Sequence, residues 1–126
     1  MPVTYKIDKE RRLVSSTAYG VVTREEILDH QRRLAADPDF SPTFSHIADF
    51  TRTTKLEIKA ADVQAFAAKN IFATTVRRAI VVADGEAFGL ARMFEILRDA
   101  KGEEGNRVFH KMEDALKWIS SSPWST

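Results

Sequence analysis

The sequence contains no cysteine, no strong excess of charge of either sign and no long hydrophobic run. The lack of cysteine excludes disulfides, zinc–thiolate sites and a cysteine nucleophile. The formal net charge of +1 provides no field that would attract nucleic acid or an anionic membrane. No apolar run approaches the ~20 residues of a membrane span. Residues 1–12 lack the apolar segment of a secretory signal, so we expect a cytoplasmic protein.

The length and composition are those of one globular domain. The chain has 126 residues, of which 44% are hydrophobic and 29% charged. A chain of this size buries enough surface to form a core without metals or disulfides. No repeat or linker divides the sequence, so we predict a single domain over residues 1–126, with residues 120–126 as a flexible tail.

The segment 77–98 determines the expected architecture. Its apolar run 79–83 shows no alternation with polar residues, which is typical of a parallel strand buried on both faces. Asp84-Gly85 then predicts a turn, and a helical pattern follows from about residue 86 to 101. Gly102 stands just past this helix, a usual position for glycine.

Hydrophobic periodicity and turn residues predict the other elements. The capping-box pattern at 23–26 indicates a helix start. We expect Gly20 to end the second strand and residues 51–57 to form a polar connection. The first two strands are close enough for an antiparallel hairpin. The order is therefore β-β-α-β-α-β-α-β-α, an α/β fold with a mixed, mostly parallel sheet and helical cover. Strands are expected at 4–7, 12–19, 45–50, 77–83 and 106–109, and helices at 24–36, 58–72, 86–101 and 112–119.

Three segments and this order resemble the STAS family, and most of all the small bacterial SpoIIAA-like (STAS/SEC14-like) proteins. The segments are 5–20 (YKIDKERRLVSSTAYG), 46–50 (HIADF) and 79–97 (AIVVADGEAFGLARMFEIL). The resemblance covers about residues 4–119. It implies a SpoIIAA-like fold and a non-enzymatic module that binds a protein partner or a small, lipid-like apolar ligand.

Phosphorylatable members of this family carry Asp-Ser-Ser-Gly at the start of the helix after the third strand. The corresponding position here reads Glu57-Ile58-Lys59-Ala60, without a hydroxyl or a glycine. The phosphoserine switch is therefore expected to be absent. Thr53 and Thr54, a few residues upstream, remain as phosphorylation candidates.

Polar residues at two predicted strand ends form the candidate ligand site. Carboxyl ends of parallel strands meet at one edge of a sheet, beside helix N-termini that attract anions. Alternatively, Asp84 caps the helix while Gly85 supplies the turn, and 49–54 is a solvated loop. An enzyme using Asp49 and Asp84 as an acid/base pair, or a magnesium site, is a further alternative. No catalytic residue is assigned. The predicted ligand-binding residues are Asp49, Thr51, Arg52, Thr53, Asp84, Gly85 and Phe88.

Aromatic residues and histidines complete the candidates. Phe40, Phe44, Phe72 and Phe88 fall in expected loops or at helix starts, where they anchor the core, line an apolar pocket or form a dimer face. This surplus of apolar side chains favours a homodimer. The three histidines are spread over different elements without metal spacing. The paired arginines are interleaved with acids. We therefore expect no metal, no cofactor and no nucleic acid.

Overall fold

The computed structural model describes residues 2–69, 71–73, 75–83, 85–102 and 105–120. These residues form a five-stranded sheet in the order β1-β2-β3-β4-β5. β1 and β2 are antiparallel, whereas each of the other neighbouring pairs is parallel. The predicted α/β architecture, its mostly parallel sheet and its order of elements are confirmed.

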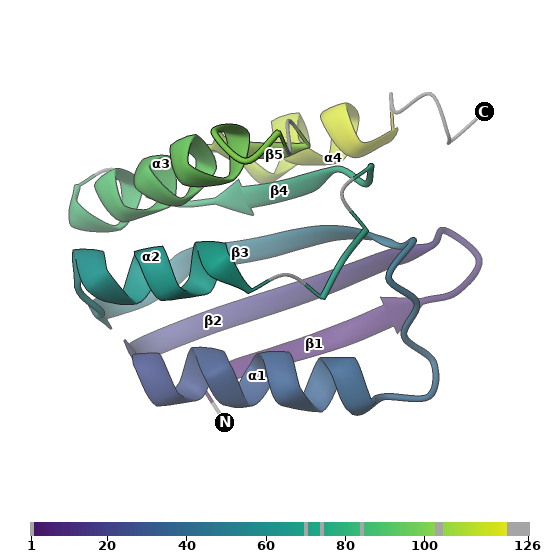
Figure 1. The fold of residues 1–126 in the computed structure, drawn as a ribbon, viewed down its shortest axis with the longest axis horizontal. Coiled ribbons are helices and arrows are strands. Elements are labelled where there is room, and N and C mark those ends of the chain that lie inside the picture. The colour runs from purple at the N-terminus through teal and green to yellow at the C-terminus, as the bar shows by residue number, and fades with distance from the viewer. Residues whose placement is uncertain (1, 70, 74, 84, 103–104, 121–126) are drawn as a thin grey trace.

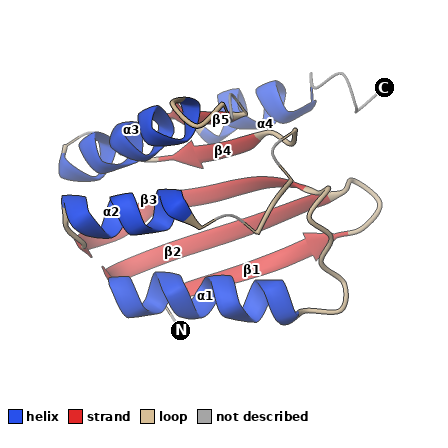
Figure 2. Ribbon diagram, viewed as in Figure 1, coloured by secondary structure: helices blue, strands red, loops and turns tan. Residues whose placement is uncertain are grey.

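The helices cover both faces of the sheet (Figures 1 and 2). Helices α1, α2 and α3 lie on one face, here called the three-helix face, and α4 lies on the other. The strands are β1 (Val3–Asp8), β2 (Leu13–Thr23), β3 (Ser45–Glu57), β4 (Arg78–Val81) and β5 (Asn106–Phe109); the helices are α1 (Arg24–Ala36), α2 (Ala60–Ala68), α3 (Glu86–Asp99) and α4 (Met112–Ser120).

Two of the predicted boundaries are wrong for a common reason. β2 does not end at Gly20, and residues 51–57 are not a connection but the second half of β3. The two strands pair in parallel along their whole length, from Leu13 beside Ser45 to Thr23 beside Glu57. This ladder satisfies the backbone, so polar and exposed side chains are tolerated there. Gly20, with φ of 68°, lies at an irregularity of the ladder.

The second helix is also shorter than predicted. α2 ends at Ala68, with Lys69 as its C-cap, rather than at residue 72. The apolar residues that extended the helical pattern pack elsewhere: Phe72 is 5% exposed and joins the core on the three-helix face, with Ile71 against it. Ile71 and Phe72 therefore pack into the core although they belong to the loop that follows α2.

Alternation along β3 divides the core into two sides. Ile47 packs towards α4 with Ala115 and Ile119. His46 and Ala48 face the opposite way, because successive side chains of a strand point to opposite faces. The three-helix face is built from two further clusters, one around Val14, Leu34, Phe44, Phe72 and Val76 and one around Val3, Ala18 and Val22.

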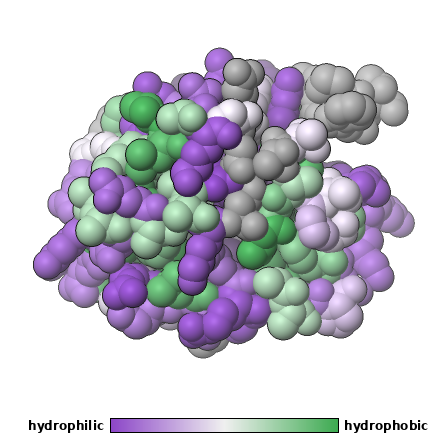
Figure 3. Space-filling view, in the orientation of Figure 1, coloured by the Kyte–Doolittle hydropathy of each residue, from purple (hydrophilic) through white to green (hydrophobic). Residues whose placement is uncertain are grey.

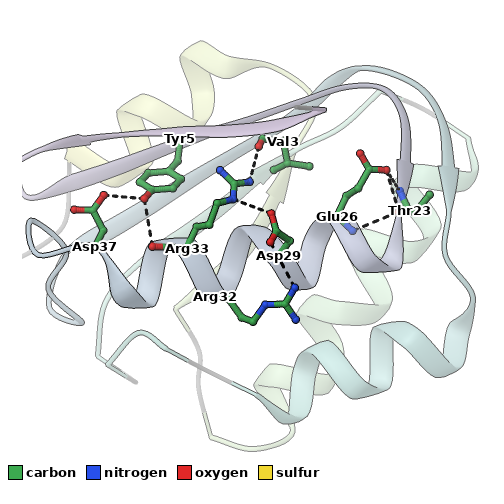
Figure 4. Close-up of polar contacts among 8 residues, drawn as sticks. All are labelled: Val3, Tyr5, Thr23, Glu26, Asp29, Arg32, Arg33 and Asp37. Carbon is green, nitrogen blue, oxygen red and sulfur yellow. Dashed lines mark hydrogen bonds and ion pairs between the residues drawn. The ribbon is translucent and has the colours of Figure 1, made fainter.

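Helix α1 is fixed at both ends (Figure 4). At its start, Thr23 and Glu26 form the predicted capping box, with the Glu26 N–H donating to the Thr23 hydroxyl at 3.3 Å and the Thr23 N–H to the Glu26 carboxylate at 3.0 Å. Near its end, Arg33 donates to the Val3 carbonyl at 2.9 Å, and the Tyr5 hydroxyl to Asp37 at 2.7 Å. These bonds fasten α1 to the edge strand β1.

Candidate functional site

A cavity of about 130 Å³ lies between the three-helix face of the sheet and the helices that cover it. Figure 3 views the molecule from this side, where apolar surface is interrupted by hydrophilic residues. Each of the three helices supplies apolar side chains to the cavity: Ile27 and Leu34 from α1, Val63 and Phe66 from α2, and Leu90 and Phe94 from α3.

The sheet supplies most of the polar groups of the cavity. The hydroxyl of Ser16, on β2, lies 2.8 Å from Nε2 of His30, on α1, and 2.8 Å from Nε2 of His46, on β3. All three residues line the cavity and are no more than 6% exposed. The three side chains are named here the Ser–His cluster.

The hydroxyl of Ser16 has one proton, so it can donate to only one of the two imidazoles. At least one ring therefore donates its Nε2–H to the Ser16 oxygen. Burial, followed by the positive charge of Arg33 and Arg78, lowers the pKa of His30 to about 4. Burial and the charge of Arg78 also hold the pKa of His46 well below its usual value. Both imidazoles are therefore neutral at pH 7.

Arg78 brings a cation to the same face. It stands directly beside His46 in the β3–β4 register, and it lines the cavity. Its guanidinium lies over the ring of Phe72, 4.6 Å from the centroid, and 5.7 Å from that of Phe94. The His46 ring stacks on Phe72 as well, at 4.9 Å. Burial, followed by the charge of Arg98, lowers the pKa of Arg78 to about 10, which leaves it charged at pH 7.

A buried arginine connects two walls of the cavity. Arg98, on α3, is 2% exposed, and its Nη1 donates a hydrogen bond to the carbonyl of Ala67 on α2. Burial lowers its pKa. Sequence periodicity does not identify Arg98 as an inward residue, because an arginine near the end of a helix also fits the solvent-exposed position that favours the helix dipole.

Among the predicted site residues of β3, Asp49 lines the cavity. Strand alternation places its side chain on the same face as Ile47, and Oδ1 accepts hydrogen bonds from the N–H and hydroxyl of Thr51, at 2.8 and 2.6 Å. Arg52 is exposed, and Thr53 donates its hydroxyl to the Phe50 carbonyl at 2.7 Å. Thr51, Arg52 and Thr53 thus lie farther along β3, past the end of β4.

The other predicted site residues lie around the start of α3. Gly85, with φ of 102°, occupies the N-cap, the position that the sequence had suggested for Asp84. Asp84 itself lies outside the described residues. Phe88 is half-buried and stacks on His110, with ring centroids 4.7 Å apart. A ligand-binding role for Phe88 and its neighbours stays a prediction.

Sequence reasoning missed the Ser–His cluster because its members come from three elements. One signal was available in α1. His30 follows Ile27 by three positions and precedes Leu34 by four, so it shares their inward face. A histidine on an apolar stripe requires a buried polar partner, which here is Ser16.

Within the described residues, no group of three or more histidine, cysteine, aspartate or glutamate side chains is placed to hold a metal ion. None of the helices in this part of the chain combines the length and hydrophobicity needed to cross a membrane.

The chain has a SpoIIAA-like fold. A solved structure with this fold, an uncharacterized protein of the DUF3478 family from Shewanella loihica PV-4, is similar to it over 93% of both chains. The TM-score is 0.58 and the sequence identity 20%, so the likeness concerns the fold. The sequence matches no protein-family model. It has no significant match among curated proteins.

Proposed function

We propose that this chain is a non-enzymatic, STAS/SEC14-like binding module that holds a small apolar ligand beneath α1, α2 and α3. The observation that carries this proposal is the cavity of about 130 Å³ with apolar side chains from three helices. Protein interiors are normally close-packed, and voids of this size are few. An apolar cavity of about 150 Å³ is sufficient to bind benzene. The cavity therefore suits one aromatic ring or a short hydrocarbon chain.

A small ligand fits this geometry better than a protein partner does. Ligand sites are concave and mostly apolar, with a few placed polar groups. Ser16, His46 and Arg78 provide such groups from the sheet, and His30 provides one from α1. The predicted homodimer would use the outer surface, and the mass of the protein in solution tests it.

The distance between the Ser16 hydroxyl and Nε2 of His30 is that of a nucleophile and its general base. The pKa of His30 does not fit this role. A general base works best when its pKa lies near the working pH. Burial lowers the pKa of His30 to about 4, so this imidazole is a poor proton acceptor for Ser16 at pH 7. The Ser–His cluster therefore suits a structural role, in which Ser16 links His30 of α1 to His46 of β3, better than a catalytic one. The alternative enzyme, with Asp49 and Asp84 as acid and base, requires a residue outside the described part of the chain.

Toluene is a suitable probe of the cavity, because its ring is of the expected size. We expect saturating toluene to raise the Tm of the protein, since a ligand that binds only the folded state stabilises it. Ala87→Phe would place a ring in the cavity, which Ala87 lines from α3, and should abolish the shift. Ala35→Phe, at an exposed position of α1, is the matched control and should retain it. An unchanged Tm of the unmodified chain would contradict the proposal.

Native mass spectrometry of the protein as purified gives an independent test. A small molecule that is retained under gentle conditions and lost from Ala87→Phe would identify the natural ligand. Retention of the same molecule by both Ala87→Phe and Ala35→Phe would place its binding site elsewhere.

A further inference from the structure

We infer that the ligand carries a hydroxyl group, as a small phenol or alcohol does, and that this hydroxyl completes the hydrogen bonding of the Ser–His cluster. The inference rests on the proposed function, because it names the chemical class of the ligand for the same cavity. Its basis is a buried polar cluster that lines the cavity and has more hydrogen-bonding groups than its own two bonds use.

The number of protons in the cluster determines what it can still bind. At pH 7 both imidazoles are neutral, so the hydroxyl of Ser16 and the two rings carry three donor protons and four acceptor lone pairs between them. The bonds of the Ser16 oxygen to Nε2 of His30 and to Nε2 of His46, each of 2.8 Å, use two protons and two lone pairs. One donor and two acceptors are therefore left over.

Every arrangement of these protons leaves an imidazole nitrogen as an acceptor. A ring that donates its Nε2–H to Ser16 is neutral only with a lone pair on Nδ1, and at least one ring is of this kind. If both rings donate, both Nδ1 atoms carry a lone pair and the Ser16 proton is the donor left over. Among the described residues, none is hydrogen-bonded to Nδ1 of His30 or of His46.

Aromatic contacts hold the two rings without supplying this partner. His46 stacks on Phe72, with centroids 4.9 Å apart, and Tyr5 lies at 83° to His30, with centroids 5.6 Å apart. The hydroxyl of Tyr5 donates to Asp37 at 2.7 Å, so it is engaged elsewhere. Both imidazoles line the cavity, and a bound ligand can reach them there. Because buried polar groups are normally hydrogen-bonded, a polar group on the ligand is expected at this place.

A hydroxyl matches the remaining groups better than other common head groups do. It donates one proton and accepts through its oxygen, so it can use both the donor and an acceptor that the cluster has left. A carboxylate only accepts, and an ammonium group only donates. A primary amide does both, but it needs more room than a cavity of about 130 Å³ leaves beside an aromatic ring.

Phenol and toluene form a matched pair of probes, since one has a hydroxyl where the other has a methyl group. In calorimetric titration of the full chain at pH 7, we expect phenol to bind at least as tightly as toluene. A cavity without a hydrogen-bond partner would favour toluene by about tenfold or more, because burying an unpaired hydroxyl is unfavourable. A preference for toluene would overturn the hydroxyl assignment and leave the proposed apolar site intact. If neither compound binds, the proposed function itself fails, and the inference with it.

Nitrogen NMR of the protein with labelled histidines locates the contact. Phenol should shift the ring-nitrogen resonances of His30 or His46 more than toluene does, because only phenol forms a hydrogen bond with the cluster. Equal shifts with the two compounds would overturn the inference.

Variants of the two histidines provide a further test. His30→Phe and His46→Phe each remove one imidazole and retain a ring, and in at least one of them toluene should bind about tenfold more tightly than phenol. Ser15→Ala, at an exposed position of β2, is the matched control and should keep the ratio of the unmodified chain. An unchanged ratio in both histidine variants would contradict the inference. If neither variant folds, the two probes and the nitrogen resonances of the unmodified chain still decide it.

Discussion

The imidazole rings of His30 and His46 lie face to face in the interior, with centroids 6.3 Å apart and planes inclined by 19°. The hydroxyl of Ser16 joins their Nε2 atoms. Protonation of both rings would destabilise the arrangement, because two imidazolium rings would repel each other and Arg78. The stability of the fold around this cluster should therefore decrease at acid pH.

The first prediction concerns this sensitivity. Between pH 6.5 and about pH 4 the unfolded chain binds a proton on His30 that the folded chain does not, because burial, Arg33 and Arg78 lower its pKa to about 4 and Asp29 only partly opposes them. The free energy of unfolding should fall as the pH drops through this window, by roughly 2 kcal/mol at pH 5 from His30 alone. His46 adds to the fall in the same direction.

Urea denaturation at pH 7, 6 and 5 measures this dependence. In His30→Gln the slope should be smaller, since this side chain no longer titrates. Ser15→Ala, which removes no titratable group and lies at an exposed position of β2, should leave the slope of the unmodified protein unchanged. Equal free energies of unfolding at pH 7 and pH 5 would show that neither imidazole is held neutral by the fold.

The second prediction concerns the hydroxyl that joins the rings. Ser16→Ala leaves two buried Nε2 atoms without their partner, and we expect the free energy of unfolding to fall by about 1–3 kcal/mol. Ser15→Ala, one position earlier, faces the other side of β2 and is exposed, so its effect should stay within about 0.5 kcal/mol. Similar losses in the two variants, measured by chemical denaturation, would mean that the hydrogen bonds of Ser16 contribute nothing specific.

The third prediction contrasts two glycines. Gly89 is exposed within α3, and a Cβ added to it meets no atom within 4 Å, so Gly89→Ala should stabilise the protein by about 1 kcal/mol. A Cβ on Gly105 would overlap the carbonyl of Val76, and its own carbonyl accepts from Arg78 N–H at 2.6 Å. Gly105→Ala should therefore lower the Tm. The reverse order of Tm values would contradict the packing of this turn against the start of β4.

The fourth prediction concerns the capping box of α1. Thr23→Ala removes the acceptor for the N–H of Glu26 and should cost about 1 kcal/mol. Thr23→Ser keeps the hydroxyl and should retain most of the stability. Thermal denaturation followed by circular dichroism compares the two variants. Equal loss in both would assign the effect to the methyl group of Thr23 rather than to the cap.

The sequence predicted the fold well where local chemistry determined it. Helix α1 has the predicted bounds because Thr23 and Glu26 define its start and Asp37-Pro38 its end. β5 is correct as well. The sequence also placed Asp49 at the sheet edge where the third and fourth strands end. In the structure Asp49 pairs with Val81, the last residue of β4.

The rest depended on partners that no local pattern contains. Residues 51–57 look like a polar loop, and they become a strand only because β2 runs beside them. The Ser–His cluster is equally non-local: fourteen positions separate Ser16 from His30, and thirty separate Ser16 from His46. No local pattern indicates that the guanidinium of Arg78 lies over the rings of Phe72 and Phe94. Such contacts require the tertiary structure.

The extension of β3 has a consequence for the behaviour of the protein at high concentration. β4 pairs with β3 only from His46 to Asp49, so in the described structure the second half of β3 has β2 on one side and no strand on the other. Exposed strand edges invite pairing with another chain and hence aggregation. This half carries Arg52, Lys55 and Glu57, all exposed, and charged side chains on an edge discourage that pairing. The polarity that concealed the strand from sequence reasoning thus protects the chain from self-association through its backbone.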